Sequence, residues 1–354
     1  MAAVTTPATL RQPSSMRRRQ TGISLVELMV AIAIGLFLLA GITALISQQS
    51  SARAELDKSS RQIESGRYAY TLLQDDIEHA GYYGRFGGTM TASSVMPNPC
   101  SVVKANLDDA LALPLQGYDA PTSVPAPLSD CLADANHVPG TDILVTRRLE
   151  TGDVLASPST GFAGQVYVQT TPADKKIGIG PDPTPAAPST YTLVQKDATT
   201  PAPLWRYLQS VYFISPCNRF AAGTTVCTSA ADGGKPVPTL KRLELTTSGG
   251  APAFVITPLV DGIQNMQLDF GVDAIGAGTP AVPFIAAPAL ADWPNVMAVQ
   301  VSLLARNTDA TAGYSDTKTY SMGSAGSVGP FADAYKRHVY TGTVRVINPS
   351  SRRE

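Results

Sequence analysis

The longest apolar run of this 354-residue chain covers residues 23–46, and Glu27 is its one ionisable side chain. At about 1.5 Å rise per residue, an α-helix of this length extends roughly 36 Å, enough to cross a hydrocarbon core of about 30 Å. The pattern therefore predicts a membrane-spanning helix. Arg17, Arg18 and Arg19 precede the run. This bias of positive charge predicts a cytoplasmic N-terminus and an exported remainder.

The helix is expected to continue beyond the span as an amphipathic segment over residues 47–84. Apolar side chains recur on one face about every seven residues, while most charged side chains fall elsewhere. The members of this stripe are Leu56, Ile63, Tyr70, Leu73, Ile77 and Ala80. Gly81 and Gly84 follow, and glycine commonly ends a helix because it tolerates positive φ.

After residue 140 the periodicity becomes that of strands. Strands are predicted at residues 142–149, 165–170, 190–195, 208–215, 240–246, 263–270, 296–304 and 340–347. In 263–270, Met266 and Leu268 alternate with Gln267 and Asp269, as in a half-buried antiparallel strand. A helix followed by runs of strands predicts an α+β fold.

Two stretches lack such periodicity. Residues 90–139 and 171–189 are rich in Pro and small side chains, and they are expected to form loops. The second stretch is a candidate boundary between two sub-lobes of a periplasmic, β-rich domain over residues 85–354.

Composition agrees with an exported, loop-rich β domain. Charged residues make up 16% of the chain, below the usual level of about 25%, and Gly and Pro are plentiful. The net charge is -1, and the only run of more than two adjacent Lys or Arg residues is Arg17, Arg18 and Arg19. A nucleic-acid partner is not indicated, because binding would need a basic patch.

Four cysteines follow the predicted span: Cys100, Cys131, Cys217 and Cys227. Export places them in an oxidising compartment, where disulfides are expected. Four cysteines allow three pairings, and we favour the loop-local one, Cys100 with Cys131 and Cys217 with Cys227. No spacing is the C-x-x-C of zinc or redox sites, so no metal is expected there.

The remaining polar residues do not indicate catalysis. The chain has three histidines: His79, His137 and His338. None has a neighbour at metal-ligand spacing or a nucleophile motif beside it. Asp261, Asp269 and Asp273 carry the oxygen ligands that calcium prefers, but their spacing matches no calcium loop, and exposed turn carboxylates are the simpler interpretation. We therefore expect neither an enzyme nor a cofactor.

The start of the apolar run resembles the class III leader of type IV pilins and pseudopilins. A basic stub from Met16 ends at Gly22, Ile23 begins the apolar helix, and Glu27 is the fifth residue after Gly22. The resemblance implies that prepilin peptidase removes residues 1–22 by cutting after Gly22. It also implies N-methylation of Ile23, where most pilins have Phe, and a role in assembly for Glu27. Translation is expected to begin at Met16.

Two simpler interpretations compete with this leader. A secretory signal peptide cleaved at residues 52–54 would have an uncharged apolar region of only about 7–15 residues. A plain single-pass anchor fits the length of the helix, but it leaves the spacing of Gly22 and Glu27 to chance.

Four further blocks resemble the PilW family of type IV minor pilins. They are DIEHAGYYG at 76–84, PLVDGIQNMQLDFGVD at 258–273, DWPNVMAVQVSLLAR at 292–306 and RHVYTGTVRVIN at 337–348. The resemblance implies a pilin-like fold, in which a long helix packs on an antiparallel sheet. Residues from 90 to about 200 carry no such block.

The resemblance also implies a function. The chain would be an inner-membrane minor pilin that primes pilus assembly, at the tip, and supports adhesion and twitching motility. Its expected partners are other minor pilins, the major pilin and prepilin peptidase. The alternatives are a J-type minor pseudopilin of type II secretion and a membrane-anchored periplasmic binding or adhesive module.

Overall fold

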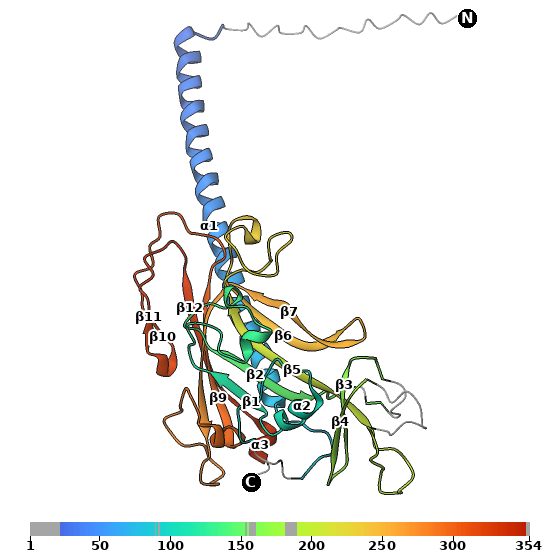
Figure 1. Ribbon diagram of the computed structural model, residues 1–354. Coiled ribbons are helices and arrows are strands. Elements are labelled where there is room, and N and C mark those ends of the chain that lie inside the picture. Colours follow the sequence, from blue (N-terminus) through green and yellow to red (C-terminus); the bar gives the residue numbers. More distant parts are fainter. Residues whose placement is uncertain are drawn as a thin grey trace, which may run out of the picture. The chain divides into compact units, whose positions relative to one another are not determined.

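The structure is a computed structural model (Figure 1), and it describes residues 22–88, 90, 93–152, 154–155, 161–180 and 190–351. The chain divides into two units, Met1–Glu55 and Leu56–Glu354. The described part of the first, residues 22–55, is called the anchor segment below. The second is called the globular unit. The basic leader residues Arg17, Arg18 and Arg19 lie outside the described residues.

Helix α1 (Leu25–His79) contributes residues to both units. It ends at His79, five residues before the predicted bound of 84. Gly81 and Gly84, which were expected to end it, have φ of 74° and 61°, and the Gly81 N–H donates to the carbonyl of Arg147 at 2.9 Å. The predicted stripe is only half correct, because Leu56 and Ile63 are exposed by 67% and 46%. The buried positions of α1 are Gln62, Gly66, Ala69, Leu73, Asp76 and Ile77.

A seven-stranded antiparallel sheet forms the first half of the globular unit. Its path is β1 (Leu115–Tyr118), β2 (Ile143–Leu149), β5 (Leu204–Ser215), β3 (Val166–Thr170) and β4 (Lys175–Ile179), with β6 (Thr239–Ser248) and β7 (Ala251–Asp261) branching from β5. Strand β5 is long enough to pair with β3 through its first residues and with β6 through its last. It therefore joins both parts of this sheet.

A three-stranded antiparallel sheet carries the C-terminal third, in the order β12 (Arg337–Arg345), β9 (Val296–Arg306) and β8 (Ile263–Val272). A short ribbon, β10 (Tyr320–Ser321) with β11 (Ser327–Val328), lies between β9 and β12 in the chain. The globular unit also contains two short helices, α2 (Lys104–Ala110) and α3 (Ile347–Ser351). The long helix followed by antiparallel sheets confirms the predicted α+β, pilin-like fold.

Several boundaries differ from the predictions. Residues 190–195 form no strand, and only an isolated bridge joins Val194 to Pro201. Strands β1 and β4 occupy stretches expected to be loops, and β7 was not expected at all. The last strand ends at Arg345, and α3 follows it.

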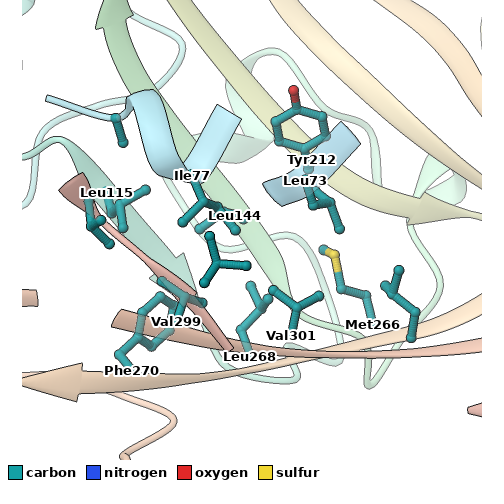
Figure 2. Close-up of a cluster of buried hydrophobic side chains, with 14 of the residues drawn as sticks. Leu73, Ile77, Leu115, Leu144, Tyr212, Met266, Leu268, Phe270, Val299 and Val301 are labelled. Carbon is teal, nitrogen blue, oxygen red and sulfur yellow. The ribbon is translucent and has the colours of Figure 1, made fainter. Parts of the chain in front are cut away.

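One large core cluster draws side chains from α1 and from both sheets (Figure 2). Leu73 and Ile77 come from α1, Leu144 from β2, and Leu268 and Val301 from the three-stranded sheet. Each of the five is at most 1% exposed. Burying such a side chain contributes about 1.5–3 kcal/mol, so this cluster holds the helix and the two sheets together.

Strand β8 of the three-stranded sheet is buried on its second face as well, contrary to the predicted half-buried alternation. Gln267 and Asp269 of β8 are only 4% and 5% exposed. The amide of Gln267 donates to the carbonyl of Gly140 at 2.9 Å, and Asp269 accepts the N–H of Ser324 at 3.1 Å. Loops from both halves of the unit thus cover this face.

A buried ion-pair network fixes the segment between β9 and β12. The Arg337 guanidinium donates to Asp316 at 2.8 Å and to Asp333 at 2.6 Å, and it lies 3.9 Å from the centre of the Phe331 ring. The side chains of Arg337 and Asp316 are fully buried. Removing one member would leave a buried charge unpaired, which makes this network a strong local constraint.

Candidate functional site

The predicted processing junction lies at the start of the described chain. Apart from its neighbours in the chain, no described residue has an atom within 4 Å of the position that a Cβ at Gly22 would take. Ile23 is 73% exposed. Glu27 lies in the first turn of α1, and it is exposed and forms no hydrogen bond or ion pair with a described residue. The junction is therefore accessible. The Glu27 carboxylate has no partner within the described part of the chain.

The anchor segment presents apolar side chains on all sides. Within the described residues, one helix is long and apolar enough to cross a membrane, and none of its most apolar window is buried. Phe37 is 80% exposed and Leu25 75%. A helix that is apolar all round needs a nonpolar environment, which a bilayer or a bundle of similar helices supplies.

In the globular unit, α1 docks through a buried carboxylate. Asp76 accepts hydrogen bonds from Arg148 at 2.7 Å and from the hydroxyls of Thr146 and Tyr212 at 2.8 Å each. Burial, and then the charge of Asp76, raises the pKa of Tyr212 above its usual value. Three donors from β2 and β5 thus satisfy one acceptor on the helix, which fixes α1 against the seven-stranded sheet.

Two aromatic rings and two glycines fix α1 against β12. A Cβ at Gly66 of α1 would collide with the ring of Tyr340, and a Cβ at Gly342 would collide with the ring of Tyr70. Each glycine is thus a notch that receives a ring from the other element. The Gln62 amide, four residues before Gly66, donates to the carbonyls of Ala305 and Lys336 at 2.9 and 3.0 Å.

The four cysteines form two disulfides, Cys100 with Cys131 and Cys217 with Cys227, with Cα–Cα distances of 5.5 and 5.7 Å. These are the loop-local pairs expected from the sequence. The first closes the loop that contains α2 and β1. The second lies beside Lys241, whose ammonium is 4.3 Å from the centre of the Phe220 ring and whose pKa burial lowers to about 8.

The histidines and aspartates considered as ligands are dispersed. His137 is buried against the carbonyl of Thr141, at 3.0 Å, and the His338 ring meets the Tyr340 ring edge-on. Asp273 accepts the N–H groups of Ala277 and Gly278. No group of three metal-ligating side chains occurs among the described residues.

A groove of about 1150 Å³ lies beside α1, and the sequence did not predict it. Its walls are α1 from Lys58 to Thr71, the end of β7, the end of β9 and the start of the loop after β5. Five cations line it, against the carboxylates of Glu64 and Asp261 alone. The cations are Lys58, Arg61, Arg67, Arg219 and Arg306. We call it the basic groove. Its cations come from separate segments, so no run in the sequence marks it.

The long N-terminal helix, with its exposed apolar anchor segment, and the antiparallel sheets are those of a pilin-like α+β fold. Two family models match the chain. The one described as Type IV Pilus-assembly protein W matches residues 225–348, and the Prokaryotic N-terminal methylation motif matches residues 17–43. No curated protein matches.

These two matches confirm the resemblance found in the sequence. They are those of a PilW-family pilin with a class III leader, and they support a type IV pilus-associated, pilin-like protein. The first match runs from before β6 to the start of α3, so β1 to β5 lie outside it. Pilin matches indicate a structural, non-enzymatic protein, and the family implies contacts with other pilus components.

Proposed function

We propose that this chain is a minor pilin that primes type IV pilus assembly together with other minor pilins, at the pilus tip. Prepilin peptidase cuts between Gly22 and Ile23, after which residues 23–46 hold the protein in the inner membrane with the globular unit in the periplasm. Residues 47–84 form the amphipathic half of the helix, and residues 85–354 the β-rich domain. The positive charge of Arg17, Arg18 and Arg19 supports this orientation.

The observation that carries the proposal is the exposed anchor segment with Glu27 at the fifth position after Gly22, inside the matched methylation motif. A carboxylate at the centre of a membrane helix costs about 2.5–3.5 kcal/mol on insertion scales, and polar residues in such helices generally have a function. Cleavage creates a free amine at Ile23. That amine on a neighbouring subunit would be a cation suited to Glu27.

The size of the globular unit supports a position at the tip. It extends from Leu56 to Glu354. A domain of this size is larger than a repeating shaft subunit needs, but it suits a cap or an initiating complex. Its apolar helix can pack into the same bundle as the helices of other pilins.

Processing is tested first, in cells that assemble pili. Mass spectrometry of the mature wild-type protein is expected to find Ile23 at the N-terminus. Gly22→Leu is expected to leave the uncleaved precursor in the membrane, because the cleavage motif needs a residue without a side chain there. Any other mature N-terminus contradicts the proposed site.

Deletion of the chain then tests the function. Surface pili and twitching motility are expected to fall, while synthesis of the major pilin continues, and Glu27→Ala should be inserted and processed yet fail to restore pili. Loss of exoprotein export with normal piliation would identify a type II pseudopilin instead. No change in either would favour the anchored binding or adhesive module.

A further inference from the structure

The basic groove carries more positive charge than its own carboxylates neutralise. Asp261 already accepts hydrogen bonds from Asn218 at 3.0 Å and from Thr239 at 3.3 Å. Arg61 meets Asp309 only at 3.8 Å, and both side chains are more than 60% exposed. Such a pair is worth little in water, so the groove attracts an anionic ligand.

The groove also has a polar group without a partner. Asn307 lines it and is 2% exposed, and neither its amide nitrogen nor its amide oxygen has a hydrogen-bond partner among the described residues. Buried amides are nearly always paired, so such an exception calls for an explanation. Both amide atoms are closed off from solvent, so the Asn307 side chain has to turn into the groove before a ligand there can pair with it. A ligand that offers one donor and one acceptor side by side would then satisfy both atoms. The peptide backbone offers this combination.

The rest of the lining favours an extended chain. Ile63 and Tyr68 are 46% and 54% exposed on the α1 wall, and Leu259 lies on the opposite wall. The lining therefore offers apolar contacts as well as charged ones. An extended peptide places successive side chains on opposite sides and can meet both kinds of contact.

We propose that the basic groove binds an extended, acidic segment of a partner protein. Arg67 on the α1 wall and Arg219 on the facing loop pair with its carboxylates, while Asn307 pairs with its backbone. This binding is independent of the role in priming assembly, since it requires only the globular unit and a partner in the same compartment.

The full chain, in nanodiscs of phosphatidylcholine, tests this proposal with short fluorescein-labelled peptides. One peptide alternates Glu with Val, and two matched peptides replace Glu by Gln or Lys. Fluorescence anisotropy is expected to show the tightest binding for the Glu peptide, weakened by salt. Arg67→Gln with Arg219→Gln should weaken it about tenfold, because two solvent-exposed charge pairs are lost. Lys176→Gln with Lys196→Gln removes the same charge elsewhere and should have no effect.

A second measurement locates the peptide. Tyr68→p-benzoylphenylalanine is expected to cross-link to the Glu peptide on illumination. The same replacement at Phe162, which is 72% exposed and lies outside the groove, should not. Thermal unfolding of each variant checks that the globular unit remains folded.

Three results would overturn the proposal. They are equal affinity for the three peptides, absence of binding by the Glu peptide, and equal affinities of the groove and control variants. Displacement of the peptide by phosphatidylglycerol vesicles, with vesicle binding lost in the groove variant, would assign the groove to lipid headgroups and would also overturn it.

Discussion

The two halves of α1 have the same backbone conformation but opposite relations to their surroundings. In the anchor segment every large apolar side chain from Leu25 to Ile46 is at least half exposed. In the globular unit the apolar Leu56 and Ile63 are exposed, whereas Gln62, Gly66 and Asp76 are buried. Hydropathy therefore identifies the half that needs lipid or another helix. The docked half depends on shape and on hydrogen bonding as well as on its buried apolar residues Leu73 and Ile77.

The largest expected effect contrasts the carboxylates of the two halves. Asp76→Ala should destabilise the globular unit by about 3–5 kcal/mol, because it leaves Arg148 partly buried without its partner. Glu27→Ala should not change the free energy of unfolding of that unit. Urea denaturation of the full chain in micelles, followed by the fluorescence of the buried Trp205 and Trp293, measures both. A loss below about 1 kcal/mol for Asp76→Ala would contradict the docking role.

The disulfides belong to the globular unit alone, and removing them should affect only that unit. Replacing Cys100 and Cys131 by Ser should cost about 3.5 kcal/mol, and replacing Cys217 and Cys227 about 2.5 kcal/mol, because the first pair closes the longer loop. The same denaturation experiment gives the two values. Free thiols in the denatured, unreduced wild type would contradict the pairing.

Matched glycines give the next contrast. Gly66→Ala should destabilise the globular unit by about 1–3 kcal/mol, because the added methyl group collides with the Tyr340 ring. Gly35→Ala, with nothing within 4 Å of the added methyl group, should leave the unit unchanged. If Gly66→Ala is equally neutral, the notch is not a constraint. The double variant Gly66→Ala with Tyr340→Ala should recover part of the stability that Gly66→Ala loses, because the colliding ring is gone.

The last expected effect is a pH dependence from Asp142, which accepts the N–H groups of Ala120 and Leu268. Burial raises the pKa of this carboxyl from 3.8 to about 7. A raised folded-state pKa contributes stability that is present below about pH 4 and lost as pH rises towards 7. Between these pH values, the free energies of unfolding of the wild type and of Asp142→Asn should diverge by at most about 1.4 kcal/mol per pH unit.

Other carboxyl groups act in a different pH window. Arg337 lowers the pKa of Asp333 by hydrogen bonding. Burial raises the pKa of Asp316, but the hydrogen bonds from Arg337, Tyr320 and Lys318 together with the charge of Arg337 outweigh burial, so this pKa is lowered as well. Their stabilisation is present above about pH 4 and is lost as pH falls. Wild type and Asp142→Asn share these groups, so the difference between the two isolates Asp142. Parallel stability curves from pH 4 to 8 would contradict the raised pKa.

The sequence predicted the features whose cause is local. The apolar run needs only its own composition, the end of α1 needs Gly81 and Gly84, and β8 and β9 follow from strict alternation. Strand β7 was missed because Pro252 and Pro258 argue against a strand interior. The two prolines are tolerated because β7 pairs with β6 alone among the described strands, so the backbone position that lacks an N–H can face the open edge.

The features that could not be predicted depend on partners distant in the chain. As polar residues on a helix, Gln62 and Asp76 would be expected to face solvent. Their burial depends on contacts with Lys336 and Tyr212, which are distant in the sequence. Gln267 and Asp269 alternate like exposed residues, and only the covering loops bury them. The basic groove assembles cations from separate segments. In each case the missing information is tertiary contact.

The notches at Gly66 and Gly342 have a mechanical consequence. One turn of helix is about 5.4 Å, and a shift of α1 by that amount along β12 would bring a residue with a side chain under Tyr340. A purely apolar contact could slide at constant buried area, but two seated rings cannot leave their notches without first separating the helix from the strand. Tension along α1 would therefore pass into the three-stranded sheet as a shear load, with little slippage before the contact breaks.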